Sequence, residues 1–248
     1  MELYGLIGKT LTHSFSKNYF DNKFEKKGVN AQYQLFEMEK LEDLHLFAEK
    51  YPELKGLNVT IPYKREVLVQ LDGMSKVVEM VGSANVIKIV RLDGKIKLFG
   101  YNTDVIGFEK TLKPLIKGRK FLRALILGGG GAAHAVSYVL RKHGIYYCYI
   151  TRNPKKIQDA GYSWINEKTM QDYQLIVNTT PLGMYPKINA CPEIPYQYIT
   201  KNHILYDLIY NPEKTLFLKK GEENGAIIKN GLDMLKIQAD ESWKIWNK

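Results

Sequence analysis

A glycine-rich segment between an apolar run and an alanine-rich run is the part of this sequence most typical of ligand binding. Residues 123–127 predict a strand, Gly128–Gly131 follows, and Ala132 and Ala133 open a predicted helix over 132–142. Gly128, Gly130 and Ala133 satisfy the pattern G-x-G-x-x-G/A, whose small residues allow a tight turn, close approach of the backbone to phosphate, and packing of the helix on the strand. Free amides at the helix start would bind a dinucleotide pyrophosphate.

The turn after the second strand of this unit, 145–150, discriminates between NAD and NADP. NAD sites usually carry an acidic residue about 20 residues after the glycines to bind the ribose hydroxyls. This chain has Thr151-Arg152-Asn153-Pro154-Lys155-Lys156 there. Arg152 and Lys156 are suited to a 2′-phosphate through charge-assisted hydrogen bonds, so the predicted cofactor is NADP. A solvated basic turn is the alternative.

Three further segments combine groups that could bind or protonate a polar substrate. Ser14 and Ser16, on one side of a short extended segment, could both donate to one carboxylate, unless Ser16 caps a helix beginning at Lys17. Asn58–Lys64 ends a strand and supplies an amide, a hydroxyl and an ammonium, although a lone lysine is usually a solvated surface residue. Gly100–Asp104 supplies an amide and a carboxylate, unless Asp104 only caps the next helix.

The spacing of apolar residues predicts an α/β protein. Before residue 100, strands and helices alternate, with a hairpin around Asp93-Gly94 and a helix beginning at Lys64. After Gly118, strands joined by helices predict a doubly wound parallel sheet. The expected strands are 3–7, 32–36, 56–59, 84–90, 95–100, 123–127, 145–150, 175–177, 204–208 and 226–228, and the expected helices are 17–27, 40–51, 104–115, 132–142 and 233–248.

Composition excludes several classes of protein. The 248 residues, 45% hydrophobic and 25% charged, are typical of a globular protein, and no leader or membrane-spanning run is evident, so we expect a cytoplasmic protein with no membrane partner. The net charge is +10, but the lysines are spread over predicted helix faces without a nucleic-acid-binding motif, and we expect no nucleic-acid partner. Cys148 and Cys191 suggest no disulfide framework, and the five histidines lack ligand spacing, so no metal is expected.

Together these segments resemble the shikimate dehydrogenase family over nearly the whole chain and in the family's order. The resemblance is carried by Ser14–Ser16 (S-x-S), Asn58–Lys64 (N-V-T-x-P-x-K), Gly100–Asp104 (G-x-N-T-D), Asn178–Met184 (N-T-T-P-x-G-M), Asp207–Pro212, and Gly231–Leu235 with Gln238. It implies the reversible, NADPH-dependent reduction of 3-dehydroshikimate to shikimate, with Lys64 and Asp104 as the catalytic pair. An ammonium beside the carbonyl oxygen would stabilise the negative charge that hydride transfer creates and could supply the proton, while Asp104 would orient Lys64.

The remaining site residues also follow from the resemblance. It implies substrate contacts from Ser14, Ser16, Thr60, Asn85, Tyr210 and Gln238. It implies NADP(H) contacts from Gly128, Gly129, Gly130, Gly131, Ala132, Ala133, Thr151, Arg152, Lys156, Thr179 and Gly231.

The resemblance also implies two domains with a cleft between them. Residues 1–103 with 233–248 would form the substrate-binding, catalytic domain, because Gln238 must return to it, and 104–232 a Rossmann-like NADP-binding domain. The protein would be a monomer or a homodimer. The chain departs from the family pattern at Val86, where threonine is common, at Thr151-Arg152-Asn153, where N-R-T is common, and at His134, where arginine is frequent. These departures bear on cofactor packing and affinity.

Three alternatives remain at the level of sequence. A relaxed member of the family would accept quinate or use NAD. A folate-linked dehydrogenase of similar plan would have no reason for a serine pair that binds carboxylate. A non-catalytic NADP-binding sensor would be expected to have lost the lysine or the aspartate, and this chain keeps both.

Overall fold

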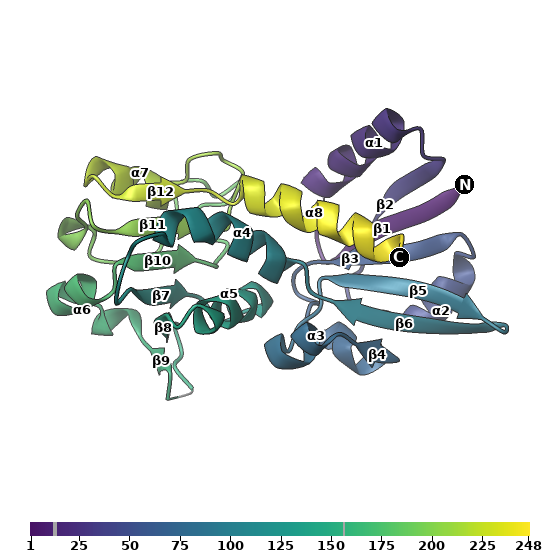
Figure 1. Cartoon of the computed structure of the whole chain (residues 1–248), viewed down its shortest axis with the longest axis horizontal. Helices are drawn as coiled ribbons and strands as arrows, with labels where there is room; N and C mark the ends of the chain where they lie inside the picture. Colours follow the sequence, from purple (N-terminus) through teal and green to yellow (C-terminus); the bar gives the residue numbers. More distant parts are fainter. Residues whose placement is uncertain (12–13, 156) are drawn as a thin grey trace. The chain divides into compact units, whose positions relative to one another are not determined.

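The computed structural model describes residues 1–11, 14–155 and 157–248 and consists of two compact units. The first unit comprises Met1–Thr103 with Gln238–Lys248, and the second comprises Asp104–Ile237. Each unit is built on one six-stranded sheet with helices packed against it (Figure 1). The predicted α/β class is confirmed.

The sheet of the first unit is mixed, in the order β2-β1-β3-β5-β6-β4. β1 pairs in parallel with β2 and β3, whereas β5 is antiparallel to β3 and β6. The β5–β6 hairpin turns through Asp93 (φ 49°) and Gly94 (φ 73°), the left-handed pair that a two-residue hairpin turn requires. The strands are β1 (Glu2–Gly8), β2 (Ala31–Glu37), β3 (Leu54–Val59), β4 (Gly73–Met74), β5 (Val86–Leu92) and β6 (Lys95–Tyr101).

Helices bury one apolar core on each side of this sheet. One core includes Trp246, whose ring lies 4.9 Å from that of Tyr4 and 5.4 Å from that of Phe20, and the other core includes Phe47 and Val67. The helices of this unit are α1 (Phe15–Lys27), α2 (Leu44–Lys50), the 3₁₀ helix η1 (Glu66–Gln70), α3 (Lys76–Val81) and the later turns of α8 (Leu232–Trp246). The sequence did not predict α3.

Two helix starts between residues 40 and 66 differ from the sequence prediction. α2 begins at Leu44 rather than Lys40, because the Asp43 side chain accepts hydrogen bonds from the amides of His45 and Leu46 and so caps the helix there. Lys64 does not begin a helix. It lies in a turn, and η1 begins at Glu66.

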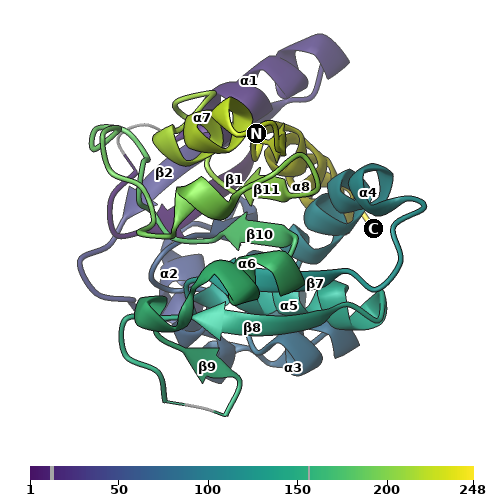
Figure 2. The same ribbon diagram turned by 90° about the vertical axis from the view of Figure 1, so that its left-hand side faces the viewer.

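The sheet of the second unit is parallel throughout, in the order β12-β11-β10-β7-β8-β9 (Figure 1). Figure 2 labels five of these strands, β11, β10, β7, β8 and β9. The chain begins this sheet in the middle, at β7, builds outward through β8 and β9, and then returns to build the other half from β10. This doubly wound order places a topological switch point between β7 and β10, where open α/β sheets bind ligands. The strands are β7 (Arg123–Leu127), β8 (Tyr146–Ile150), β9 (Asp159–Ala160), β10 (Leu175–Asn178), β11 (Ile204–Asp207) and β12 (Ile227–Lys229).

The helices of the second unit bury apolar stripes against the sheet. α5 buries Ala133, Val136 and Leu140, which share one helix face. The sequence did not predict α6 and α7, which are short. The helices are α4 (Asp104–Ile116), α5 (Gly131–Lys142), α6 (Glu167–Asp172) and α7 (Leu216–Glu223), with 3₁₀ turns η2 (Tyr162–Trp164) and η3 (Tyr196–Tyr198).

The helix α8 is divided between the two units. Its first turn packs in the second unit, where a Cβ on Gly107 of α4 would lie 2.6 Å from the Met234 carbonyl oxygen. Its last turn packs in the first unit, where the Trp246 indole donates to the Ile87 carbonyl over 3.0 Å. The boundary between units therefore falls at Gln238, five residues after the Asp233 of the sequence prediction.

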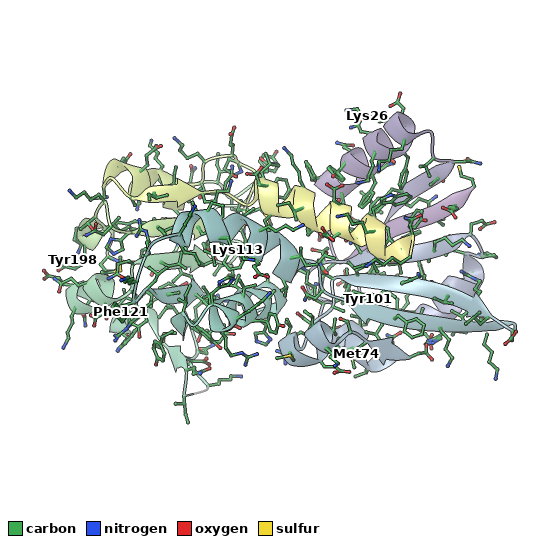
Figure 3. All side chains as sticks on the ribbon, viewed as in Figure 1. Lys26, Met74, Tyr101, Lys113, Phe121 and Tyr198 are labelled. Carbon is green, nitrogen blue, oxygen red and sulfur yellow. The ribbon has the colours of Figure 1, made fainter. Side chains whose placement is uncertain are left out.

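Basic side chains project from separate helices, as Lys26 on α1 and Lys113 on α4 show in Figure 3. In the described ranges, no helix combines the length and apolar character needed to cross a membrane.

Candidate functional site

The carboxyl ends of β1 and β3 gather most of the predicted substrate-binding residues of the first unit. Thr60 follows β3 directly, and its amide donates to the Ile7 carbonyl at the end of β1 over 2.9 Å. Asn58 pairs with Val86 and Val86 with Tyr101, so the start of β5 and the end of β6 lie at this same edge. The edge therefore places Thr60, Asn85 and Thr103 beside one another.

A buried hydrogen-bond network holds Asn85 and Gln238 at this edge. The Thr103 amide donates to Asn85 Oδ1 over 2.7 Å, and Asn85 Nδ2 donates to Gln238 Oε1 over 3.3 Å. Asn85, Thr103 and Gln238 are 3%, 0% and 8% exposed. Asp104 is itself buried and begins α4 immediately after Thr103. The network thus fixes the end of the segment that carries Asp104.

Sequence reasoning missed Tyr33 and Ser242, which extend this network. Asn58 Nδ2 donates to the Asn85 carbonyl and to Ser242 Oγ, so Asn58 Oδ1 is the atom that accepts the Tyr33 hydroxyl over 2.8 Å. The Ser16 hydroxyl then bonds to the phenolic oxygen. Burial raises the pKa of Tyr33 well above its usual range, and the bond from Ser16 opposes this shift. Nothing in the local sequence indicates these partners, because they lie on β2 and α8.

The serine pair lies at the start of α1. α1 begins at Phe15, with Ser14 as the extended N-cap residue, and Ser16 is in the first turn. Capping of α1 by Ser16, the alternative left open by the sequence, is therefore wrong, and the pair is not in one extended segment. Ser14 makes no side-chain capping bond within α1 as described. The positive end of the helix dipole lies at this helix start, which suits an anionic group.

The turn that carries Lys64 is anchored on both sides. The Lys64 carbonyl accepts from the Ala84 amide over 2.8 Å, and the Tyr63 hydroxyl donates to the Met38 carbonyl. Lys64 is half-buried. These contacts fix the backbone from which the ammonium projects.

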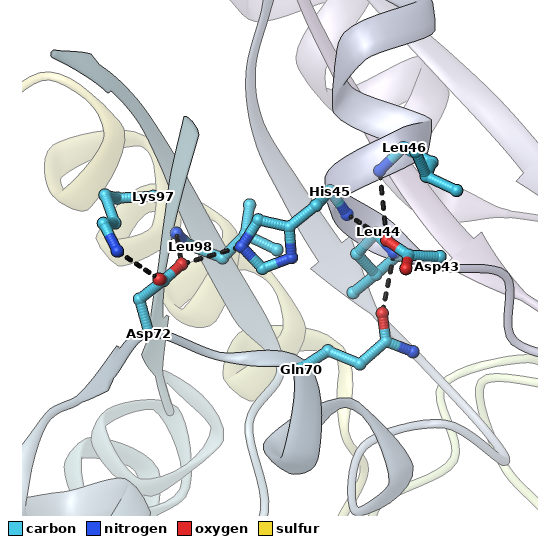
Figure 4. Close-up of polar contacts among 8 residues, drawn as sticks. All are labelled: Asp43, Leu44, His45, Leu46, Gln70, Asp72, Lys97 and Leu98. Atoms are coloured by element: carbon cyan, nitrogen blue, oxygen red, sulfur yellow. Dashed lines mark hydrogen bonds and ion pairs between the residues drawn. The ribbon is translucent and has the colours of Figure 1, made fainter. Parts of the chain in front are cut away.

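The segment after η1 is anchored by a separate polar network at the protein surface (Figure 4). Gln70 Oε1 accepts from the Leu44 amide over 2.7 Å, and the Asp72 carboxylate accepts from Lys97 over 2.7 Å and bonds to His45 over 2.9 Å. The bond from Lys97 holds the pKa of Asp72 well below its usual range. Within the described ranges, no group of three or more His, Cys, Asp or Glu residues is arranged to hold a metal ion.

The predicted dinucleotide loop lies at the switch point of the second unit. Gly128 has φ +109°, and a Cβ there would lie 2.7 Å from Thr179 Oγ1. The Thr179 hydroxyl donates to the Leu127 carbonyl over 2.7 Å, which joins the loops after β7 and β10. Gly130 precedes α5 as its N-cap residue, and among the described residues other than its two chain neighbours no atom lies within 4 Å of the position its Cβ would take. Open backbone at a helix start fits a phosphate group.

We predict opposite outcomes for alanine at these two glycines. Gly128→Ala should lower the free energy of unfolding by about 1–2 kcal/mol, because a side chain is strained at positive φ and meets Thr179. Gly130→Ala should leave the melting temperature unchanged and weaken NADPH binding, because its methyl group would occupy space left for phosphate. Thermal melts and NADPH titrations of both variants check this. An unchanged affinity in Gly130→Ala would contradict a phosphate site at this glycine.

The end of β8 carries the predicted 2′-phosphate site. Arg152 is exposed, and Lys156 lies outside the described residues. Thr151 Oγ1 is buried and, among the described residues, has no hydrogen-bond partner, while its Cγ2 is 3.5 Å from the position of a Cβ on Gly129. A buried hydroxyl that lacks a partner next to the glycine loop fits a polar ligand such as a dinucleotide. The ring of His134 stands edge-on to that of Tyr149, 6.2 Å away.

Tyr210 and Gly231 lie near each other in the second unit, beyond the end of β11. The Gly231 amide donates to the Ile209 carbonyl over 3.0 Å, and a Cβ on Gly231 would overlap the Leu208 carbonyl. Only glycine therefore fits beside this backbone.

A buried carboxylate lies at the end of β11, at the first residue of the motif Asp207–Pro212, and the sequence assigned it no site role. Asp207 is 0% exposed and accepts from Asn178 Nδ2 over 3.1 Å, from the Ile209 amide over 3.0 Å and from the Thr215 hydroxyl over 2.6 Å. Burial raises the pKa of Asp207 to about 6, and these three bonds oppose the shift.

This pKa predicts a pH dependence of stability. The folded-state pKa of Asp207 is above its unfolded value, so the native state binds the proton more tightly, and the free energy of unfolding falls as the pH rises from about 4 to above 6. The loss amounts to about 3 kcal/mol at most. Asp207→Asn removes this titration, so the difference in melting temperature between Asp207→Asn and the parent should grow in favour of the variant from pH 5 to pH 8. A difference that is constant with pH would contradict the raised pKa.

Comparison with known proteins identifies the family. Residues 6–87 match the family model of the shikimate dehydrogenase substrate binding domain. The chain is 38% identical to shikimate dehydrogenase (NADP(+)) of Clostridium beijerinckii, over 100% of this chain and 93% of that protein. The chain belongs to the shikimate dehydrogenase family. The resemblance inferred from the sequence motifs is therefore confirmed.

Solved shikimate dehydrogenases share this fold over the whole chain. The enzyme from Aquifex aeolicus superposes with a TM-score of 0.86 at 36% identity, covering 100% of this chain and 92% of that one. The enzyme from Thermus thermophilus, solved in complex with NADP(H) and shikimate, superposes with a TM-score of 0.83 at 28% identity, covering 99% of this chain and 93% of that one.

The structure distributes the predicted site residues over both units. The first unit holds Ser14, Ser16, Thr60, Lys64, Asn85 and Gln238. The second holds Asp104, Gly128–Ala133, Thr151, Arg152, Thr179, Tyr210 and Gly231.

Proposed function

We propose that this chain is an NADP-dependent shikimate dehydrogenase that interconverts 3-dehydroshikimate and shikimate. The observation that carries the proposal is full-length similarity to enzymes of that name, in a chain that retains Lys64 and Asp104. The intact lysine and aspartate argue against a non-catalytic sensor. The serine pair argues against a folate-linked dehydrogenase.

The first unit binds the ring acid. Ser14 donates a hydrogen bond to the substrate carboxylate at the start of α1, where the helix dipole also favours an anion. The Ser16 hydroxyl turns from the Tyr33 oxygen to the carboxylate when the substrate binds, because it has only one proton to donate. Thr60, Asn85 and Gln238 bind the ring and its hydroxyls. Support comes from their position at one edge of the sheet, where buried bonds already fix Asn85 and Gln238. Tyr210, in the second unit, completes the substrate contacts.

Lys64 and Asp104 act at the reacting oxygen. NADP(H), when bound, would supply the hydride for the carbonyl carbon in one direction and would accept it in the other. The Lys64 ammonium stabilises the negative charge that develops on the oxygen and donates a proton to it. Asp104 orients Lys64 and accepts a hydrogen bond from a substrate hydroxyl. The anchored turn holds the backbone that carries Lys64, and the buried bonds of Thr103 hold the residue before Asp104.

The second unit binds NADP(H). Gly128–Gly131 with Ala132 and Ala133 hold the pyrophosphate at the start of α5, and Thr179 and Gly231 shape the neighbouring loops. Thr151 contributes a contact to the cofactor, which its buried hydroxyl without a partner among the described residues supports. Arg152 binds the 2′-phosphate together with Lys156.

Initial rates test the specificity of the enzyme. Shikimate and quinate are each assayed with NADP⁺ and NAD⁺. We expect kcat/KM to be highest for shikimate with NADP⁺. An equal kcat/KM for quinate would favour a member of the family with relaxed substrate use. An equal kcat/KM with NAD⁺ would show that the enzyme does not prefer the cofactor that carries the 2′-phosphate. We place the enzyme in the cytoplasm as a monomer or homodimer, which light scattering of the purified protein distinguishes.

A further inference from the structure

Asp207 links three separate segments at the carboxyl edge of the second sheet. One carboxylate oxygen accepts from Asn178 Nδ2 on β10 and from the Ile209 amide, and the other accepts from the hydroxyl of Thr215, the N-cap residue of α7. All of these atoms belong to the second unit. Asp207 is fully buried, so it does not reach a ligand itself.

The bond to Asn178 also links Asp207 to the loop after β10. Asn178 donates through Nδ2 to Asp207, which leaves Oδ1 to accept from the amide of Thr180 over 3.0 Å and from its hydroxyl over 2.7 Å. Asp207 therefore fixes which way the Asn178 amide points, because a carboxylate only accepts. The same loop contains Thr179, which packs against Gly128.

The bonds to Ile209 and Thr215 hold the segment after β11 and the start of α7. Ile209 lies next to Tyr210, and its carbonyl accepts from the Gly231 amide. Thr215 Oγ1 also accepts from the Leu218 amide in the first turn of α7. One buried side chain thus sets the backbone on both sides of a segment that carries Tyr210.

We propose that Asp207 is a positioning residue that sets the loop 178–183 and the segment 208–212 for binding of cofactor and substrate, acting through Asn178, Ile209 and Thr215. The inference rests on the proposed function only for the identity of the ligands. The arrangement itself is a property of the ligand-free chain.

Two substitutions separate positioning from burial. Asp207→Asn keeps an oxygen for Asn178 and Ile209 and presents an amide to Thr215, whose hydroxyl can accept it, so the arrangement survives. Asp207→Ala leaves all three donors without their acceptor. Tyr206→Phe is the matched control, because it removes a buried hydroxyl on the same strand that bonds to Thr111 on α4 and not to either loop.

The first measurement is hydrogen exchange of the ligand-free protein. We expect the amides of Thr180 and Ile209 to exchange at least tenfold faster in Asp207→Ala than in the parent, and at parental rates in Asp207→Asn and Tyr206→Phe. Parental rates in Asp207→Ala would overturn the proposal. This readout needs no cofactor, so it holds even if the proposed activity fails.

The second measurement is binding and turnover. We expect Asp207→Ala to raise the dissociation constant for NADPH about tenfold and the KM for shikimate several-fold, with both restored by Asp207→Asn and unchanged by Tyr206→Phe. Equal losses in Tyr206→Phe would show a general effect of destabilisation and overturn the proposal. A parent protein that neither binds NADPH nor oxidises shikimate would instead overturn the proposed function.

A third variant keeps the test open if Asp207→Ala fails to fold. Thr180→Val removes the hydroxyl that bonds to Asn178 at a partly exposed position, and Thr180→Ser keeps it. We expect weaker NADPH binding in Thr180→Val and parental binding in Thr180→Ser. Parental binding in both would contradict transmission through Asn178.

Discussion

Replacing Lys64 with alanine should lower kcat by about 10²–10⁴-fold, the usual contribution of a positioned general acid. The side chain would no longer stabilise the developing oxyanion or donate a proton to it. The dissociation constant for NADPH should stay at the parental value, because the glycine loop and Arg152 lie in the other unit. Steady-state rates with shikimate and NADP⁺, with a separate NADPH titration, measure the two effects.

The neighbouring Arg65 provides the matched control for this variant. Arg65 is exposed and carries the same charge one residue along the chain, so Arg65→Ala should keep kcat within about twofold. Parental turnover in Lys64→Ala would remove Lys64 from the mechanism. A loss of the same size in both variants would show that kcat depends on the net charge of this turn and not on the Lys64 ammonium itself.

Replacing Arg152 with alanine should weaken NADP⁺ binding about 10- to 100-fold, the value of one charge-assisted hydrogen bond to a phosphate. Binding of NAD⁺, which lacks the 2′-phosphate, should change by no more than about twofold. KM values for the two cofactors, each at saturating shikimate, give the comparison.

Lys168 on α6 serves as the control for net charge. It is also exposed and basic in the same unit, so Lys168→Ala should leave both cofactors unaffected apart from a small change in long-range attraction. Equal losses for NADP⁺ and NAD⁺ in Arg152→Ala would exclude a specific contact with the phosphate. A preference for NADP would then have to come from residues other than Arg152.

Local patterns in the sequence were sufficient to predict most of the strands and helices. The Asp93-Gly94 pair predicted the β5–β6 hairpin, and the glycine loop between β7 and α5 predicted the dinucleotide unit, because each depends on backbone conformations that few residues adopt. The short α3, α6 and α7 were missed. Helices of six to eight residues show too few turns for a periodic pattern and are held by caps such as Ser75 and Asn166.

The candidate site was predictable only where its residues fall in compact motifs. The prediction that Lys64 and Asp104 form the catalytic pair depends on such motifs. Tyr33 and Ser242 lie outside these motifs, and Asp207 received no role although it opens the motif Asp207–Pro212. Each of the three acts through partners on other strands and helices, and Asp207 bonds to Asn178, 29 residues away. Burial, which raises the pKa values of Tyr33 and Asp207, depends on how the sheets and helices pack and not on neighbours in the sequence.

The most direct test is the absorbance of reduced nicotinamide when the purified protein is mixed with shikimate and NADP⁺. The account predicts an increase that approaches an equilibrium value, that reverses when 3-dehydroshikimate and NADPH are the reactants, and that is nearly absent with Lys64→Ala. No increase from folded protein that binds NADPH would contradict it.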